Sequence, residues 1–441
     1  MKTAIIIGTL LLAATANIAE AGERHLVLLK GSAKNFNTSV ATLGGEVVYR
    51  HDATGFAVVE GLSDDGLSQL SLLNSVDEIA PNFTFNLPDT MMGSTSSVEL
   101  QAIENNDNPS NAFFFPRQWN LQAIQVADAW ALGRTGSAAV TVAVLDTGIA
   151  YTHIDLDGLV DLDRSASFLP QDDELVNLYF PGMHPITDLH YHGTHVASTI
   201  SSNAIAAAGV TSHTTLMGVK VCSVYGGCPG DAIFMGLAHA IDNGADIINM
   251  SLGGTFSKSE FQGYVGFLNK FFNYARAQGV TVVVSAGNSA IDMDHDGNGY
   301  KTYCSTPSTV CVSATGPESS ESINGPWLNI DSPATYTNYG RSAINVAAPG
   351  GNNGISVFAA CSNTSLVIPV CRTASSFIVG LSGTSMAAPH VSGLAAMMVE
   401  DVGRSPAKIK AALEKSADDL GQAGTDPFYG KGRINALNAV Q

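Results

Sequence analysis

The sequence predicts an α/β protein with a mostly parallel sheet that carries helices on both faces, preceded by a small α+β unit. The first observation is that short apolar runs alternate with helical patterns in residues 112–441, which is typical of a parallel sheet covered on both sides. The second is that residues 22–89 follow a different order of strands and helices. The third is the length, because 441 residues exceed one ordinary domain.

The first residues have the composition of a secretory signal peptide. Lys2 supplies a positive charge, residues 4–14 are almost uninterruptedly apolar, and Ala19-Glu20-Ala21 has the small-x-small pattern of a signal-peptidase site. A membrane anchor is the alternative, but the apolar run is too short to span a bilayer. We therefore expect residues 1–21 to be a signal peptide and the protein to be secreted, to the medium or the periplasm.

Residues 22–89 read as strand-helix-strand-strand-helix-strand, which is the ferredoxin-like order. Apolar and valine-rich runs predict the strands, and leucines at helical spacing predict the longer helix. Pro81 interrupts the last strand and favours an edge position for it. The strands are expected at residues 25–30, 46–50, 55–60 and 76–85, and the helices at 39–43 and 62–73.

Residues 90–111 differ from both neighbours in texture. They are polar, above all in Asn and Ser, with Asp107 and Gly93 among them, and have no apolar periodicity. We expect an exposed linker, which is a natural place for proteolytic processing.

The large unit, residues 112–441, is expected to contain six strands and five helices. In open parallel sheets ligands gather beyond the carboxyl ends of the strands, so chemistry is expected there. The strands are expected at residues 139–145, 215–221, 247–250, 280–285, 310–314 and 345–348. The helices are expected at residues 192–207, 231–243, 257–277, 385–402 and 405–416.

Charge and cysteine content restrict the partners and the compartment. The formal net charge of −18 argues against nucleic acid and anionic membranes, because both need a basic surface. No stretch after the signal peptide is apolar enough for a transmembrane helix. Six cysteines in an exported protein suggest three disulfides, and several connectivities are possible. Our hypothesis pairs sequence neighbours: Cys222 with Cys228, Cys304 with Cys311, and Cys361 with Cys371.

Polar motifs follow several of the expected strands. Taken singly, each has an ordinary structural explanation, such as an aspartate that closes a turn or a serine that caps a helix. Three histidines, His190, His192 and His195, would suggest zinc, but the HExxH pattern and its glutamate are absent. The motifs are Asp146-Thr147-Gly148, His192-Gly193-Thr194-His195, Ser251-Leu252-Gly253-Gly254, Ala286-Gly287-Asn288 and Gly383-Thr384-Ser385-Met386-Ala387-Ala388-Pro389.

In this order, these motifs resemble those of the subtilisin-like serine peptidases, the subtilases. The resemblance covers residues 112–441, and residues 22–89 resemble the inhibitory propeptide of that family. It implies a secreted serine endopeptidase that acts on polypeptides, needs no cofactor for catalysis, and is made as a self-processing zymogen. The propeptide would aid folding and inhibit the enzyme, with its tail near Phe85–Asp89 across the active site, and the mature enzyme is expected to be a monomer.

The resemblance also assigns roles. Asp146 matches the acid that orients the imidazole, His192 the general base and Ser385 the nucleophile, which is the set that a weakly nucleophilic hydroxyl needs. Asn288 matches the side-chain donor of the oxyanion hole. Substrate binding falls to the backbone of Ser251, Leu252 and Gly253. At the residue before the cut we expect a broad preference for apolar or aromatic side chains.

Two segments are candidates for binding calcium. Asp155 matches a calcium ligand of bacillary subtilisins, but residues 202–210 look shorter than the loop that completes that site, which puts the site in doubt. A second candidate resembles the first half of an EF-hand loop, although the last ligand position falls on Tyr303. A solvated acidic loop is the alternative. The candidate ligands for a structural Ca²⁺ ion are Asp292, Asp294, Asp296 and Asn298.

Two other classes of function are alternatives. One is a subtilase-like scaffold that has lost activity and serves as a binding module, and the other is a metallohydrolase built on the histidines. The intact set of Asp146, His192, Asn288 and Ser385 argues against the first.

Overall fold

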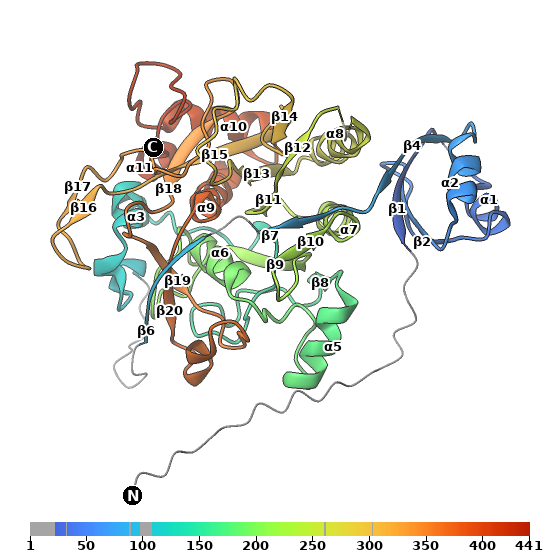
Figure 1. Cartoon of the computed structure of the whole chain (residues 1–441). Helices are drawn as coiled ribbons and strands as arrows, with labels where there is room; N and C mark the ends of the chain where they lie inside the picture. The colour runs from blue at the N-terminus through green and yellow to red at the C-terminus, as the bar shows by residue number, and fades with distance from the viewer. Residues whose placement is uncertain (1–22, 32, 88–89, 98–107, 260–261, 302) are drawn as a thin grey trace, which may run out of the picture.

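The computed structural model describes residues 23–31, 33–87, 90–97, 108–259, 262–301 and 303–441, so the expected signal peptide lies outside the described residues. No helix within these ranges is long and apolar enough to cross a membrane. A small N-terminal unit packs against one side of a larger unit built on a parallel sheet (Figure 1).

The N-terminal unit is a four-stranded antiparallel sheet in the order β2-β3-β1-β4. Side chains alternate between its two faces. Val27 and Leu29 face the unit's own helices, whereas Leu26, Leu28 and Phe56 belong to the core shared with the large unit. The elements are β1 Arg24–Leu29, α1 Phe36–Thr42, β2 Glu46–His51, β3 Phe56–Glu60, α2 Asp64–Ser71 and β4 Val76–Pro81.

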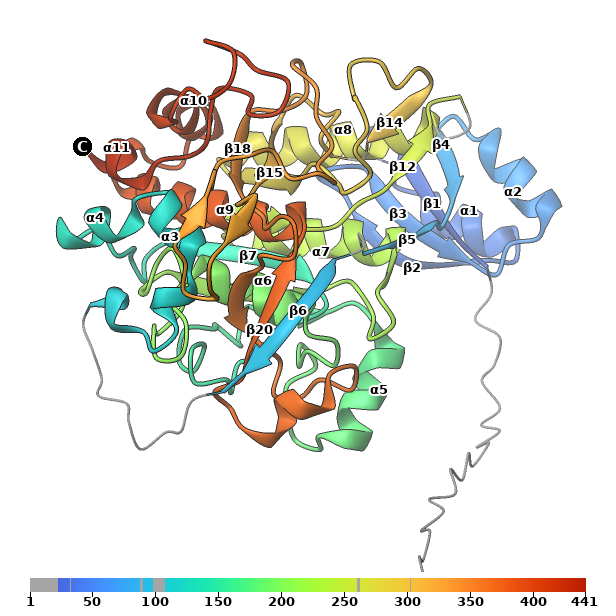
Figure 2. The same ribbon diagram turned by 60° about the vertical axis from the view of Figure 1, so that its left-hand side comes forward.

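The segment that leaves this unit is more ordered than the sequence suggested. The last predicted strand ends at Pro81, and β5 (Thr84–Asn86) pairs antiparallel with β10 (Gly227–Pro229) of the large unit. Within the predicted linker, β6 (Met91–Ser96) pairs antiparallel with β20 (Ile378–Ser382), as Figure 2 shows. Pairing of this kind uses backbone groups at an open sheet edge, so it needs no apolar pattern in the added strand.

The large unit has a seven-stranded sheet in the order β18-β15-β13-β11-β7-β9-β8. All of its neighbouring strands run parallel. The six predicted strands are present, and β8 is an additional short one. The bounds are β7 Thr141–Asp146, β8 Ala166–Ser167, β9 Thr215–Lys220, β11 Ile247–Met250, β13 Thr281–Ser285, β15 Thr309–Thr315 and β18 Val346–Pro349.

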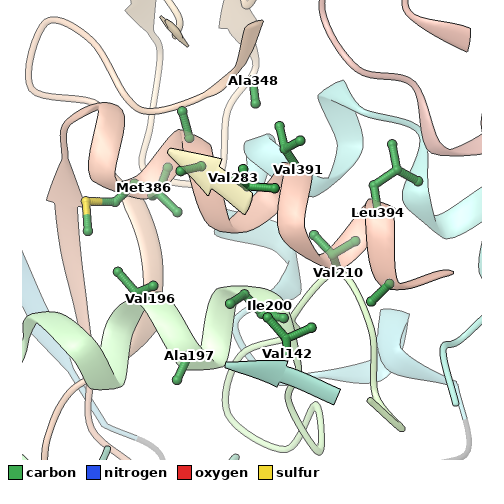
Figure 3. Close-up of a cluster of buried hydrophobic side chains, with 14 of the residues drawn as sticks. Val142, Val196, Ala197, Ile200, Val210, Val283, Ala348, Met386, Val391 and Leu394 are labelled. Atoms are coloured by element: carbon green, nitrogen blue, oxygen red, sulfur yellow. The ribbon is translucent and has the colours of Figure 1, made fainter. Parts of the chain in front are cut away.

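Helices cover both faces of this sheet, as predicted. One core contains Val142 and Val283 together with side chains of α6 and α9, which lie side by side in Figure 3. The opposite core contains Ala143 and Val282 together with side chains of α7 and α8. The helices are α3 Trp119–Ala123, α4 Val126–Ala131, α5 Pro170–Tyr179, α6 His192–Ile200, α7 Gly230–Asp242, α8 Gln262–Ala277, α9 Thr384–Val402, α10 Pro406–Ser416 and α11 Ala436–Val440.

Two predicted helices are shorter than expected. Helix α6 ends at Ile200 and not near residue 207, because the buried carboxylate of Asp155 accepts the backbone N–H groups of Ile205, Ala206 and Ala207 and holds them in a loop. Helix α8 begins at Gln262, since residues 255–257 form a strand. The remaining short elements are β12 Thr255–Ser257, β14 Gly299–Lys301, β16 Ser319–Ser320, β17 Trp327–Leu328, β19 Val357–Ala360, and the 3-10 turns Pro109–Asn111, Phe115–Arg117 and Pro369–Thr373.

The cysteines form three disulfides between sequence neighbours, which confirms the predicted pairing. They join Cys222 to Cys228, Cys304 to Cys311 and Cys361 to Cys371.

Candidate active site

The candidate catalytic side chains lie at the carboxyl end of the large sheet. Asp146 is the last residue of β7, His192 the first of α6, and Ser385 lies in the first turn of α9. All three are buried. Helices α6 and α9 pack along each other through Val196 and Met386, which belong to the same core (Figure 3). The fold therefore gathers residues that are far apart in sequence.

A short hydrogen bond joins the acid to the imidazole. His192 Nδ1 lies 2.8 Å from Asp146 Oδ1, and the backbone N–H of Thr147 donates to the same oxygen at 2.8 Å. A carboxylate next to Nδ1 favours the tautomer that carries its proton there. His192 Nε2 is then the proton acceptor of the ring, and among the described residues it has no hydrogen-bond partner.

A second buried carboxylate, Asp188, holds this pair in place. Its Oδ1 accepts the hydroxyl of Thr147 at 2.9 Å, and its Oδ2 accepts the hydroxyl of Thr194 at 2.5 Å. The Thr147 hydroxyl also accepts the backbone N–H of Gly193 at 2.9 Å. Burial raises the pKa of Asp188, and its hydrogen bonds with Thr194 and Thr147 oppose that shift. The network ties the end of β7 to the first turn of α6.

Ser385 is held by a reciprocal contact with Ser251. Its hydroxyl donates to the Ser251 carbonyl at 3.1 Å, and the Ser251 hydroxyl donates to the Ser385 carbonyl at 2.8 Å. No hydrogen bond joins Ser385 to His192 in the part of the chain that the structure describes. Catalytic hydrogen bonds are often long or misaligned in the absence of substrate, and a serine hydroxyl redirects by rotation about one bond.

Asn288 faces the start of the same helix. Its Oδ1 accepts the backbone N–H of Thr384 at 2.9 Å and the Thr384 hydroxyl at 2.8 Å, which fixes which end of the amide is the donor. A Cβ placed on Gly383 would lie 3.1 Å from Asn288 Nδ2 and 3.3 Å from Thr90 Cγ2. Asn288 Nδ2 thus faces the backbone at Gly383, two residues before Ser385.

A cavity of about 120 Å³ lies beside Asn288. Of the predicted substrate-binding residues, Leu252 and Gly253 line it, and Ser251 lies next to Ser385. The cavity is also lined by Gly287 of the Ala286-Gly287-Asn288 motif and by Lys301, which belongs to none of the motifs.

Two described residues of the N-terminal segment, Leu87 and Thr90, contact the large unit. Leu87 donates its backbone N–H to the Gly226 carbonyl at 2.8 Å on one side, beyond the end of β5. Thr90 lies against Gly383 on the other side, directly before β6. Residues 88 and 89 join these two contacts and lie outside the described residues.

The remaining histidines of the motif have structural partners. His195 is fully buried, its Nε2 lies 3.0 Å from the Val357 carbonyl, and burial lowers its pKa to about 3. Burial lowers the pKa of His190 to about 4. No group of three or more His, Cys, Asp or Glu side chains that could hold a metal occurs in the described ranges.

The predicted calcium ligands in residues 292–298 are not brought together. The Asp294 carboxylate accepts the backbone N–H groups of Arg341 and Ser342 and the Ser342 hydroxyl. Asp292 contacts His295 Nδ1 at 2.8 Å, and Asn298 donates to Ser257 and Ser259. The carboxylates of Asp292 and Asp294 thus already accept protein donors. No group of three His, Cys, Asp or Glu side chains that could hold a metal, Asp296 included, forms here among the described residues.

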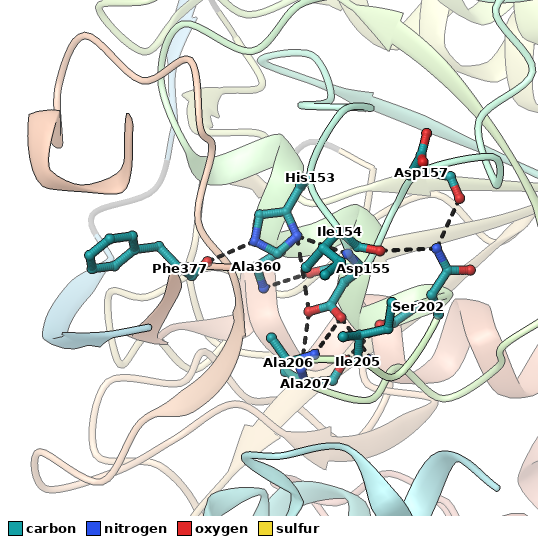
Figure 4. Close-up of polar contacts among 12 residues, drawn as sticks. His153, Ile154, Asp155, Asp157, Ser202, Ile205, Ala206, Ala207, Ala360 and Phe377 are labelled. Carbon is teal, nitrogen blue, oxygen red and sulfur yellow. Dashed lines mark hydrogen bonds and ion pairs between the residues drawn. The ribbon is translucent and has the colours of Figure 1, made fainter. Parts of the chain in front are cut away.

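The carboxylate of Asp155 is likewise occupied by protein donors. Its carboxylate accepts three backbone N–H groups, from Ile205, Ala206 and Ala207, at distances of 2.8–3.0 Å (Figure 4). Burial raises the pKa of Asp155, whereas the nearby His153 and these three bonds lower it. The short loop after α6 therefore replaces a cation with peptide dipoles.

Sequence reasoning missed two residues of this site. Asp188 stands among polar residues before His192, and only its contacts distinguish it from a turn residue. Lys301 ends the short strand β14 and belongs to no motif. The only available signal for Asp188 was the presence of Thr147 and Thr194 beside the acid and the base, two hydroxyls that need an acceptor once buried.

Comparisons with known proteins agree with this geometry. A family model described as the subtilase family matches residues 137–432. The chain is 32% identical to thermitase of Thermoactinomyces vulgaris, over 76% of this chain and 99% of thermitase. It is 30% identical to subtilisin E of Bacillus subtilis, over 73% of this chain and 71% of that protein.

Solved structures show the same fold. The epidermin leader peptide processing serine protease of Staphylococcus aureus superposes with a TM-score of 0.72 at 21% identity, over 95% of this chain and 97% of that one. Fervidolysin of Fervidobacterium pennivorans, described as a keratinolytic enzyme, also gives 0.72 at 22% identity, over 96% of this chain and 62% of that one.

Proposed function

Since the chain belongs to the subtilase family and is a serine endopeptidase, we propose that Asp146, His192 and Ser385 are its catalytic triad. The observation that carries the proposal is the 2.8 Å contact between Asp146 and His192 Nδ1, which leaves Nε2 as the proton acceptor. The start of α9, with Ser385, lies alongside the start of α6, with His192.

In the proposed mechanism, His192 Nε2 takes the hydroxyl proton of Ser385 as Oγ attacks the carbonyl carbon of the peptide. The Ser385 backbone N–H and Asn288 Nδ2 donate to the oxygen that becomes negative. The imidazolium, stabilised by Asp146, gives its proton to the leaving amine and leaves an acyl-enzyme. In the second half of the reaction, His192 takes a proton from water as the water attacks the acyl-enzyme, and then returns it to Ser385 Oγ. This step releases the new carboxyl end of the cleaved peptide. Subtilases need no cofactor for these steps.

A fluorophosphonate probe, which labels activated serines, tests the assignment. We expect it to label the mature enzyme, and labelling and casein hydrolysis to disappear together in Ser385→Ala. Ser319→Ala, a change on an exposed strand far from the motif, is the matched control and keeps both. A wild-type protein that folds but is neither labelled nor active would instead favour the inactive binding module.

We further propose that residues 22–89 are an intramolecular inhibitor and folding aid, removed by self-cleavage. Strand β5 pairs with β10 as an extended substrate would, and the apolar face of the small sheet covers α7 and α8. Leu87 is bonded to Gly226, and Thr90 lies against Gly383, two residues before Ser385, which supports a cleaved bond between Leu87 and Thr90. Ser385→Ala should therefore accumulate uncut, and N-terminal sequencing of the mature enzyme should begin at residue 88, 89 or 90.

Export through the signal peptide of residues 1–21 is part of the same proposal. Three disulfides suit an oxidising compartment, and the curated relatives include subtilisins. Structural calcium is typical of subtilases. Since the carboxylates of Asp155, Asp292 and Asp294 already accept protein donors, we assign no Ca²⁺ ion to these positions. Finding the protein in culture medium or periplasm after expression, as a monomer on gel filtration, tests the remaining points.

A further inference from the structure

A lysine lines the cavity beside the oxyanion asparagine. The cavity is bounded by Leu252 and Gly253 on one wall, by Gly287 and Asn288 on the other, and by Lys301. In the proposed mechanism the carbonyl carbon under attack lies between Ser385 and Asn288, so this cavity receives the side chain of the residue before the cut. The residues that line the cavity therefore determine which side chains the enzyme accepts immediately before the cleaved bond.

The strand pairing explains why the lysine faces the cavity. Strands β12 and β14 are antiparallel, with Phe256 opposite Tyr300 and Thr255 opposite Lys301. The rings of Phe256 and Tyr300 stack at 5.2 Å within the shared core. Side chains alternate along a strand, so Thr255 and Lys301 point to the other face, where both line the cavity.

The lysine carries a charge that the protein leaves only partly satisfied. Lys301 is 6% exposed, and its ammonium donates to the Thr255 hydroxyl. An ammonium has three donors, and in the described part of the chain no carboxylate forms an ion pair with this one. Burial lowers the pKa of Lys301, and the charge of Asp296 opposes the shift. A buried cation with donors to spare is a binding site for an anionic group.

We propose that Lys301 makes this peptidase select substrates with aspartate or glutamate immediately before the cleaved bond. This inference rests on the proposed function and names its substrate class. A carboxylate that enters the cavity would replace the water lost by the ammonium with a charge-assisted hydrogen bond. It differs from the expectation of apolar or aromatic residues, which took the pocket walls to be backbone and small side chains.

The chain's own sequence agrees with this selectivity. The proposed propeptide ends at Asp89, an acidic residue that directly precedes Thr90. Thr90 lies against Gly383, beside the nucleophile. Self-cleavage after Asp89 would use the same selectivity as cleavage of other substrates.

The test is a set of peptides that differ only at the residue before the cut: Glu, Gln, Leu, Phe or Lys. The mature enzyme should cleave the Glu peptide with a kcat/KM at least about tenfold above that of the Gln peptide, which has the same shape without the charge. Added salt should reduce this ratio. Lys301→Gln should bring it to about one, and Lys301→Glu should favour the Lys peptide. Lys258→Gln changes an exposed lysine directly after β12, the strand that pairs with β14; it is the control and should keep the wild-type ratio.

The following results would overturn the inference. A wild-type enzyme that prefers Leu or Phe, with a Glu-to-Gln ratio near one, overturns the inference even if neither Lys301 variant folds. Fluorophosphonate labelling of Lys301→Gln separates loss of folding from loss of selectivity. An enzyme that neither is labelled nor cleaves any peptide would contradict the triad assignment, and this inference with it.

Discussion

Thr194 donates two hydrogen bonds to the carboxylate of Asp188, one from its backbone N–H at 3.0 Å and one from its hydroxyl at 2.5 Å. The other oxygen of Asp188 accepts from Thr147. Thr147 follows Asp146 directly, and Thr194 lies two residues after His192. One buried carboxylate thus links the strand end that carries Asp146 to the helix turn that carries His192.

Replacement of Asp188 should therefore reduce both stability and turnover. Asp188→Asn brings amide hydrogens toward donors that need an acceptor, and we expect a loss of about 2–4 kcal/mol in the free energy of unfolding. A misplaced imidazole should lower kcat much more than it raises KM. Urea unfolding and peptide hydrolysis measure the two effects, with the exposed Asp157→Asn as control. An unchanged kcat would show that the network does not position His192.

Asn288→Ala should lower kcat with little effect on KM. The Nδ2 donor acts on the oxygen only once it becomes negative, and the loss of one such donor in subtilisin reduces turnover about 10²–10³-fold. We expect a loss of this size, measured with a peptide substrate. An unchanged unfolding midpoint in the same variant would show that the fold is intact, although the backbone N–H of Thr384 loses its acceptor. A KM effect alone would assign Asn288 to substrate binding.

Much of the large unit could be predicted from the sequence because its strands and helices each have a local, periodic pattern of apolar residues. Buried parallel strands are continuous apolar runs, and helices that cover them repeat at helical spacing. The exceptions depend on distant partners. Strand β8 has two residues, Ala166–Ser167, which is too short for any pattern. Strand β6 exists because β20 offers an open edge, and α6 stops where Asp155, some fifty residues earlier, captures the following backbone.

The site divides in the same way. Asp146, His192, Asn288 and Ser385 lie in recognisable motifs, so their proximity was expected before the fold was known. Lys301 lies in no motif, and it reaches the cavity only because β14 pairs with β12 in a register that puts Lys301 opposite Thr255. Selectivity of this kind depends on loop pairing, which periodicity does not describe.

Phe85→Ala should weaken inhibition by the N-terminal segment. The Phe85 ring lies on bare backbone, since a Cβ on Gly254 would come within 2.9 Å of it, and it packs 5.4 Å from the ring of Tyr264. Phe85 is partly buried, and loss of such an aromatic anchor at an interface costs about 1–3 kcal/mol of binding free energy. Activity should therefore appear about ten times sooner after purification of the full chain. Leu72→Ala, an exposed position of the same unit, is the control, and equal lag times in the two variants would contradict the prediction.

Asp294→Asn should destabilise the protein to the same extent with calcium or with chelator. The Asp294 carboxylate accepts from Arg341 and Ser342, so its role is to hold that backbone. Three hydrogen bonds to a charged group on the surface suggest a loss of about 1–3 kcal/mol in the free energy of unfolding. Thermal unfolding in excess Ca²⁺ and in EDTA measures it. A wild-type melting temperature that rises with Ca²⁺, in a way that Asp294→Asn abolishes, would restore the predicted metal site.

Acid should destabilise the protein through buried neutral histidines such as His390. Its Nδ1 lies 2.8 Å from the Met386 carbonyl and its Nε2 2.8 Å from Asn120 Nδ2, so one nitrogen donates and the other accepts. Burial lowers the pKa of His390 to about 4, whereas an unfolded histidine has a pKa of about 6.5. Between these values the unfolded chain binds a proton that the native protein does not, so stability falls as the pH drops from about 6.5 to about 4.

The slope of the free energy of unfolding against pH measures the contribution of His390. One such group contributes up to about 1.4 kcal/mol per pH unit, and His390→Gln should remove that share of the loss. Urea unfolding at pH 7 and pH 5, in the Ser385→Ala background to prevent self-digestion, gives the comparison. His213→Gln is the control because His213 is exposed. If His390→Gln lost as much stability between the two pH values as the parent, protonation of His390 would have no part in acid unfolding.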